Sequence, residues 1–205
     1  PVRLRRARRG ASDSRVMLSR GGVLALALLA LPAQAQASEA LWALLKSGGQ
    51  VVIMRHAATD GTAGDPDTMR LEDCSTQRNL SLSGRDEARR IGSAFKARGI
   101  TVDDVRSSIW CRCLDTATLA FGMVNPWLPL NSFFRNRERE AGQTGAVREL
   151  VSRHRGGTLI LVTHQVNITA LTGLYPAEGE MIILTPRGAD FAVAGRVKAS
   201  DVTAN

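Results

Sequence analysis

Apolar residues beyond the first 37 positions recur with the spacings of two kinds of element. Short apolar, often β-branched runs predict strands, and apolar residues three or four positions apart predict amphipathic helices. Helices are predicted at 38–46, 83–98, 112–121, 140–153 and 166–174. Strands are predicted at 50–54, 101–105, 128–130, 158–163, 181–184 and 191–197.

Most of these strands alternate with helices, which is typical of a mostly parallel sheet covered on both faces. We therefore expect residues 38–205 to form a single α/β domain, a three-layer αβα sandwich with a mostly parallel central sheet. Residues 57–80, rich in Asp, Thr, Gly and Pro, are predicted to be a long loop. Long loops inside compact domains are often functional.

The first part of the chain resembles a cleavable leader. From Met17 onward it has a basic start, an apolar run at 23–31 and then alternating alanines, which is the pattern of a bacterial signal peptide. The run has nine residues, whereas a membrane span needs about 20. We expect residues 1–37 to be removed by cleavage after Ala35 or Ala37, which predicts a periplasmic or secreted protein without stable membrane insertion. The alternative is a buried helix of the domain.

Charge is concentrated in this leader. The chain has 27 Lys and Arg against 19 Asp and Glu, for a net charge of +8, but residues 1–37 contain seven Arg and a single acid, Asp13. The remainder is close to neutral, which argues against a nucleic-acid partner because such a surface needs clustered basic charge. A composition of 44 % hydrophobic and 22 % charged residues excludes a disordered chain and a polytopic membrane protein.

Export would place the three cysteines in an oxidising compartment. Cys111 and Cys113 are too close in sequence for an easy mutual disulfide, so Cys74 is expected to pair with one of them and leave one thiol free. A Cys-x-Cys pair can also bind metal, but structural cysteines are the better interpretation.

Two histidines follow predicted strands directly. Arg55 and His56 end the first strand, and His164 ends the most strand-like segment of the chain, whereas His154 lies near a helix end and is predicted to be a surface residue. Ligands of α/β sheets bind at the carboxyl ends of the strands. Arg112 stands at a predicted helix start, where a guanidinium and free N–H groups favour a phosphate.

With these residues in place, the sequence resembles the histidine phosphatase superfamily, which includes the phosphoglycerate mutases and RHG-motif phosphatases. Four segments carry the resemblance in family order, over most of residues 51–173. They are Arg55-His56-Ala57-Ala58-Thr59, the helix entry 79–88 (NLSLSGRDEA), the element 107–117 (SSIWCRCLDTA) and the second-histidine strand 161–164 (LVTH).

The resemblance implies a role for each matching residue. His56 would be the nucleophile that carries a covalent phosphoryl group, Arg55 and Arg112 would grip the phosphate oxygens, and His164 would complete the pocket. Thr59 would add a hydroxyl contact to the substrate. Neither a metal nor another cofactor is implied, and no metal-ligand spacing is found in the sequence.

Two positions depart from the family pattern. Ala57 stands where the motif has glycine, which would be costly if the backbone there had a positive φ. The general acid is not evident: Glu138 is nearest the expected position, Glu140 is the rival, and Asp60 is a third candidate. Without an acid, substrates with good leaving groups would be preferred.

These observations predict an exported phosphatase acting on a phosphomonoester, either a cell-envelope sugar phosphate, such as a lipopolysaccharide heptose phosphate, or a phosphohistidine. The short chain leaves little room for a cap domain, so a relatively open site is expected. One alternative is a catalytically silent anion-binding or interaction module on the same fold. Another is a metal or redox protein using Cys111 and Cys113, which would contain bound metal.

Overall fold

The computed structural model describes residues 33–61 and 64–202, which form a mixed α/β fold. The helices of this part are α1 (Ala33–Lys46), α2 (Leu82–Ala97), α3 (Cys111–Phe121), α4 (Glu140–Arg153) and α5 (Gln165–Thr172). The strands are β1 (Val51–Arg55), β2 (Val102–Ser107), β3 (Asn125–Pro126), β4 (Thr158–Thr163), β5 (Met181–Arg187) and β6 (Asp190–Val197). No helix among these residues is long and apolar enough to cross a membrane.

The strands form one sheet with the order β3-β2-β4-β1-β5-β6. The first four strands of that order are parallel to one another, and β5 and β6 form an antiparallel hairpin at the β1 side. β4 lies inside the sheet and all six of its residues are buried, which explains why its sequence is almost continuously apolar.

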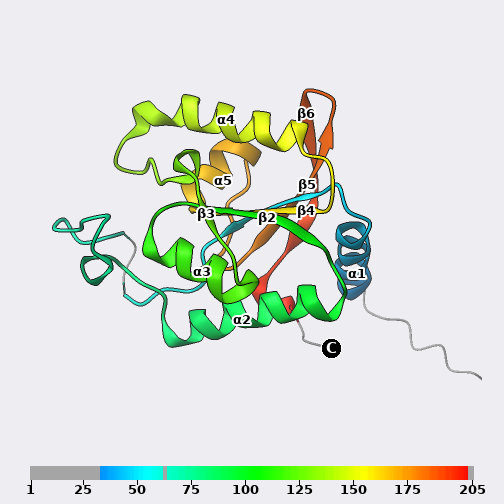
Figure 1. Cartoon of the computed structure of the whole chain (residues 1–205), viewed down its shortest axis with the longest axis horizontal. Helices are drawn as coiled ribbons and strands as arrows, with labels where there is room; N and C mark the ends of the chain where they lie inside the picture. Colours follow the sequence, from blue (N-terminus) through cyan, green and yellow to red (C-terminus); the bar gives the residue numbers. More distant parts are fainter. Residues whose placement is uncertain (1–32, 62–63, 203–205) are drawn as a thin grey trace, which may run out of the picture. The chain divides into compact units, whose positions relative to one another are not determined.

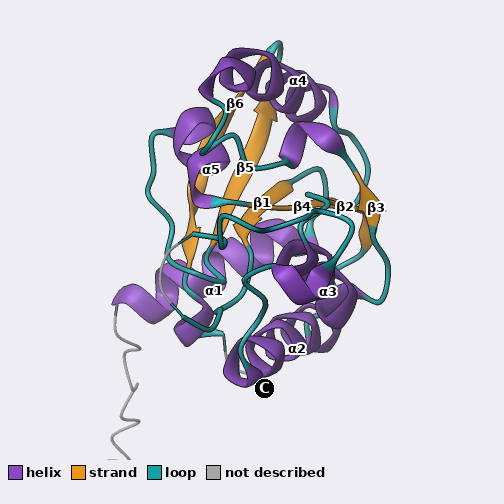
Figure 2. Cartoon of the chain, turned by 90° about the vertical axis from the view of Figure 1, so that its left-hand side faces the viewer, coloured by secondary structure: helices purple, strands orange, loops and turns teal. Residues whose placement is uncertain are grey.

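Helices cover both faces of this sheet (Figure 1 and Figure 2). Alternate residues of β1 point to opposite faces: Val52 and Met54 join a core with α1, α2 and α3, while Val51 and Ile53 join a core with α4 and α5. This alternation is the expected consequence of the two-residue period of a strand. The predicted three-layer architecture with a mostly parallel sheet is confirmed.

The predicted leader lies largely outside the described residues, including the start at Met17 and the apolar run at 23–31. Within the described part, α1 begins at Ala33, five residues before the predicted start at Ser38. The division of the chain at residue 37 stays a prediction.

The short strand predicted at Leu128 and Leu130 is wrong. The strand lies earlier, at Asn125–Pro126, and Leu128–Leu130 forms a 3₁₀ turn instead. Pro129 inside that turn has no N–H to give to a sheet, which disfavours strand pairing there. Leu130 is fully buried in the core and Leu128 is exposed, which produces the alternation that resembled a strand.

The start of α2 is packed against the segment that follows β1. Ser81 caps the helix by accepting a hydrogen bond from the Gly84 N–H (2.9 Å), and an isolated bridge pairs Thr59 with Leu80. A Cβ on Gly84 would lie 1.9 Å from the Ala58 carbonyl oxygen, so only glycine fits this contact. The end of the long loop is thereby held beside the residues after β1.

Candidate active site

Parallel strands bring the two predicted histidines to one edge of the sheet. β1 and β4 are direct neighbours, and the backbone N–H of His56 donates to the Thr163 carbonyl (3.0 Å) just past their ends. The rings of His56 and His164 lie 5.7 Å apart, centroid to centroid. The structure therefore assembles the pair that the sequence placed at two separate strand ends.

His56 is held in one tautomer. Its Nδ1 lies 2.9 Å from the Ala57 carbonyl oxygen, which can only accept, so Nδ1 carries the proton and Nε2 has the free lone pair. Burial lowers the pKa of His56 well below its usual value and the charge of Arg112 lowers it further, while the hydrogen bond that His56 donates to the Ala57 carbonyl raises it in part. The ring is therefore neutral near pH 7, as a nucleophile must be.

Ala57 fits its position without strain. Among the described residues, positive φ angles occur only at glycines, so the glycine of the family motif is not needed here for its backbone freedom. The Ala57 N–H donates to Thr116 Oγ1 (3.0 Å), whose own hydroxyl donates to the Arg112 carbonyl (2.6 Å). Thr116 thus connects the chain after β1 to the first turn of α3.

Arg112 is the second residue of α3 and is almost completely buried. Its two terminal nitrogens bind the two carboxylate oxygens of Asp65, at 2.7 Å from Nη1 to Oδ1 and 3.1 Å from Nη2 to Oδ2. Nη2 also lies 3.4 Å from Nδ1 of His164. The predicted position at a helix start is confirmed, but the partner Asp65 was not expected.

Arg55 and Thr59 lie at the same edge and share another carboxylate, Glu178. The Arg55 Nη2 lies 3.3 Å from Glu178 Oε1, and Thr59 Oγ1 donates to the same oxygen at 2.9 Å. Arg55 Nη1 donates to the Pro176 carbonyl (3.2 Å). Glu178 is half-buried in the segment before β5 and is a residue that the sequence interpretation missed.

Arg78 is a further arginine of the cluster that sequence reasoning missed. Its Nη1 donates to Thr59 Oγ1 at 2.5 Å and lies 3.5 Å from Glu178 Oε1. Burial lowers the pKa of Arg78, and the nearby charge of Arg112 contributes to that shift. The only sequence signal for it was its place next to the matched helix entry that begins at Asn79.

The three arginines share a feature that points to an anion. Within the described residues, the Nε–H groups of Arg55, Arg78 and Arg112 are each buried without a hydrogen-bond partner. Buried N–H groups are almost always paired because leaving one unpaired costs about 1–3 kcal/mol. Three such donors around two neutral histidines can supply hydrogen bonds and positive charge to a phosphoryl group.

His164 makes contacts on both ring nitrogens. Because Arg112 can only donate, Nδ1 of His164 accepts from it, and Nε2–H is left to donate to Ser108 Oγ at 2.8 Å. Burial lowers the pKa of His164 well below its usual value, and the charges of Arg112 and His56 lower it further. Trp110 packs edge-on against its ring, 5.2 Å between centroids.

The predicted acids do not join this cluster. Glu138 is exposed in a 3₁₀ turn, Glu140 pairs with Arg137 (3.2 Å), and Asp60 is exposed on the loop after Thr59. The carboxylates that the structure places at the cluster are Asp65 and Glu178, both from connecting segments. The role of general acid predicted for Glu138 stays a prediction, and in this structure Glu138 is exposed.

The structure pairs Cys74 with Cys111 in a disulfide and leaves Cys113 as a buried free thiol. Burial raises the pKa of Cys113 to about 12, so it is not a reactive thiolate. With Cys111 in the disulfide, the predicted alternative of a metal site at Cys111 and Cys113 lacks one of its ligands. The disulfide fastens the long loop to the first residue of α3, next to Arg112.

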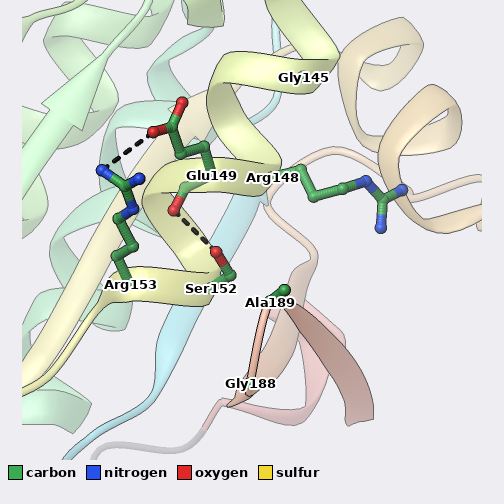
Figure 3. Close-up of a pocket in the computed structure, with 7 residues that line it drawn as sticks. All are labelled: Gly145, Arg148, Glu149, Ser152, Arg153, Gly188 and Ala189. Carbon is green, nitrogen blue, oxygen red and sulfur yellow. Dashed lines mark hydrogen bonds and ion pairs between the residues drawn. The ribbon is translucent and has the colours of Figure 1, made fainter.

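One smaller prediction was wrong. His154 is not a surface residue but half-buried, with Nε2 2.9 Å from the Gly157 carbonyl oxygen. His56 is 2 % exposed and Asp65 of the long loop binds Arg112 at the start of α3, while the relatively open site stays a prediction. The large hollow in Figure 3 is at another place, between α4 and the β5–β6 hairpin, and encloses about 510 Å³.

Known structures share this fold. The chain matches the protein histidine phosphatase SixA complexed with tungstate (15 % identity, TM-score 0.57) and Bacillus stearothermophilus YhfR (18 %, 0.54). It also matches a mutant phosphoserine phosphatase from Entamoeba histolytica in complex with phosphoserine (12 %, 0.55). Each match covers 75 % of this chain and 99 % of the other. No protein-family profile and no curated protein sequence matches the chain.

These likenesses establish the fold. This chain shares the α/β fold of the protein histidine phosphatase SixA, the fold that the four sequence motifs predicted. In this chain, that fold carries a pair of strand-end histidines among arginines.

Proposed function

We propose that this protein is a phosphatase that hydrolyses phosphomonoesters through a covalent phosphohistidine on His56. The observation that carries the proposal is the neutral His56, with Nε2 free, beside three arginines whose Nε–H groups have no partner in the described part of the chain. A neutral imidazole can attack phosphorus, and the arginines neutralise the charge that would repel it.

The reaction takes two displacements. Nε2 of His56 forms a bond to phosphorus while the bond from phosphorus to the leaving oxygen breaks, and that oxygen takes a proton. Water then attacks phosphorus, the P–N bond breaks, and inorganic phosphate leaves while Nε2 regains its lone pair. Arg55, Arg78 and Arg112 hold the phosphoryl oxygens in both steps, and His164 holds Arg112 in place by accepting a hydrogen bond from its Nη2.

Protonation of the leaving group is the step that the cluster assists least. Glu138 is exposed, and the carboxylates at the cluster are bound to arginines, so a proton from solvent serves leaving groups that need little help. We therefore propose a preference for aryl phosphates and phosphoramidates, phosphohistidine included, over simple alkyl phosphates. Two proteins with this fold are named as a protein histidine phosphatase and a phosphoserine phosphatase, and a cell-envelope sugar phosphate is the other substrate we propose.

We also propose that the protein is exported to the periplasm or secreted. The support is the predicted leader together with the Cys74–Cys111 disulfide, a bond that persists in oxidising compartments. N-terminal sequencing of protein recovered from the periplasm would begin near Ser38, and a start near Pro1 would overturn the proposal.

The test of the activity compares two histidine substitutions in the full chain. His56→Ala should lower turnover of p-nitrophenyl phosphate on the order of 10⁴-fold, while His154→Ala, before the opposite end of β4, should leave it unchanged. A radiolabelled phosphoryl group trapped on wild type should be stable to base and lost in acid. Turnover that survives in His56→Ala would overturn the mechanism.

A wild-type protein that releases no phosphate from aryl, sugar or protein phosphates would overturn the proposed enzyme. If phosphate then still raised its melting temperature, the predicted silent anion-binding module would be the better description. A ranked panel of active substrates would instead begin to name the physiological one.

A further inference from the structure

Asp65 is a nearly buried carboxylate that the proposed reaction does not use. Its side chain is 9 % exposed, although it lies on the long loop between β1 and α2. Each of its oxygens accepts two hydrogen bonds. Oδ1 accepts from Arg112 Nη1 (2.7 Å) and the Arg78 N–H (3.0 Å), and Oδ2 accepts from Arg112 Nη2 (3.1 Å) and Trp110 Nε1 (3.2 Å).

The contact with Asp65 uses only one edge of the Arg112 guanidinium. Both terminal nitrogens, Nη1 and Nη2, bind the Asp65 carboxylate, so this edge of the guanidinium is occupied. The other edge, formed by Nε and the second hydrogen of Nη2, faces His164 and contains the buried Nε–H that has no partner among the described residues. A guanidinium has five N–H donors in a rigid plane, so fixing one edge fixes the direction of the other.

We propose that Asp65 is the positioning residue of Arg112: it holds the end of the guanidinium so that the Nε edge faces the phosphoryl group on His56. The inference rests on the proposed phosphatase activity. Its effect on substrate passes through Arg112, because Asp65 has both oxygens occupied by protein donors. Trp110 joins the same arrangement, since its indole binds Asp65 while its ring packs against His164.

Two other roles for Asp65 fit the geometry less well. A carboxylate that mimicked the substrate would occupy the unpartnered Nε edge, and Asp65 occupies the opposite one. A proton donor would need a raised pKa; burial does raise the pKa of Asp65, but its hydrogen bonds and the charge of Arg112 outweigh that effect and lower it. The loop around Asp65 is also anchored from outside, because Arg135 donates to the Asp65 carbonyl (2.8 Å).

The test uses a matched pair of substitutions two residues apart. Asp65→Asn keeps the shape but removes the charge that orients Arg112, and we expect kcat/KM for p-nitrophenyl phosphate to fall about 10- to 100-fold, as misplacing a catalytic group typically does. Affinity for inorganic phosphate, measured by calorimetry, should fall in parallel. Asp67→Asn is the control, because the Asp67 side chain is fully exposed and pairs only with Arg135 in the described structure.

A double-mutant cycle separates positioning from a general structural role. In an Arg112→Ala background, Asp65→Asn should cause no further loss of phosphate affinity, since its effect passes through Arg112. An equal loss in both backgrounds would overturn the proposal. If Asp65→Asn does not fold, Asp65→Glu, which keeps the charge, is measured in the same cycle and should lie between wild type and Arg112→Ala.

Two further outcomes would assign Asp65 another role. A loss confined to alkyl phosphates, with aryl phosphates unaffected, would make it a proton donor, and a gain in phosphate affinity would make it an internal inhibitor. Either would overturn positioning. If wild type shows no turnover at all, the proposed function fails, but the phosphate-binding cycle still decides the role of Asp65.

Discussion

Two regions of the molecule contain arginines and acids in close contact, and they behave differently. The cavity beside α4 is roomy, and its charged groups are exposed: the Arg153–Glu149 pair is 78 % and 60 % exposed (Figure 3). At the strand-end site the corresponding pair, Arg112–Asp65, is 5 % and 9 % exposed and leaves buried donors unpaired among the described residues. The comparison teaches that a cluster of buried arginine donors without partners supports a proposed anion site more strongly than hollow volume does.

Of the changes that would test this comparison, reduction of the Cys74–Cys111 disulfide, beside the strand-end site, is expected to have the largest effect. The Cys74–Cys111 bond closes a loop of 37 residues, and loss of such a crosslink destabilises a fold by about 4 kcal/mol in the chain-entropy description. For a domain of this size the melting temperature should fall by roughly 10 °C.

Activity should fall with it, because the bond fastens the loop carrying Asp65 and Arg78 to α3. The measurement is thermal unfolding and turnover with and without reductant. Cys74→Ser should reproduce the reduced state and then show no response to reductant. An unchanged melting temperature would contradict the expected contribution.

A pair of glycine substitutions sharpens the comparison. A Cβ at position 84 would lie 1.9 Å from the Ala58 carbonyl, whereas one at Gly145, in the helix lining the cavity, would meet nothing within 4 Å. Gly84→Ala should therefore destabilise by about 1–3 kcal/mol through overpacking and lower activity by shifting the backbone after His56. Gly145→Ala should stabilise by roughly 1 kcal/mol, the helix preference for alanine. Urea denaturation measures both; equal effects would contradict the close contact at Gly84.

Acid should lower the stability of the fold through the two histidines of the strand-end site. The pKa values of His56 and His164 are both lowered in the fold, chiefly by burial, so below their ordinary pKa of about 6.5 the unfolded chain binds more protons than the folded one. Their contribution to stability is therefore present above that pH and is lost as the pH falls. Melting temperatures between pH 7.5 and 5 should decrease, and the decrease should be smaller in His164→Asn. A melting temperature that rose toward acid would reverse the sign assigned here.

The smallest effect is expected at the cavity. Arg153→Ala removes an exposed ion pair one turn apart on α4, which is worth less than about 0.5 kcal/mol. Stability and phosphatase activity should both stay at the wild-type level. A marked loss of activity would mean that this cavity takes part in function after all.

The sequence predicted those site residues that stand where a regular element begins or ends. Arg55, His56 and His164 follow apolar runs, and Arg112 opens a helix, so periodicity predicted where they lie, and the family resemblance supplied their roles. Asp65, Arg78 and Glu178 lie on connecting segments. Their positions depend on contacts between distant parts of the chain, such as the bridge from Thr59 to Leu80, which no local pattern encodes.

The errors have the same origin. The strand predicted around Leu128 failed because a proline and a single buried leucine mimic alternation. Ala57 was expected to strain the backbone if its φ were positive, yet its φ is not positive. Patterns of apolar residues report burial well, but they say little about the path of a loop.

The adjacency of β1 and β4 has a consequence for how the protein is made. Val51 pairs with Leu159, so the two histidines come from segments separated by most of the domain. Because such long-range pairings carry a loop-closure cost, we expect this one to form late in folding. A nascent or partly refolded chain can already contain its helices and still lack a site. The rate at which activity returns after denaturation would therefore report when β1 pairs with β4. A chain truncated before β4 would lack His164 and would be inactive even if its first half folded.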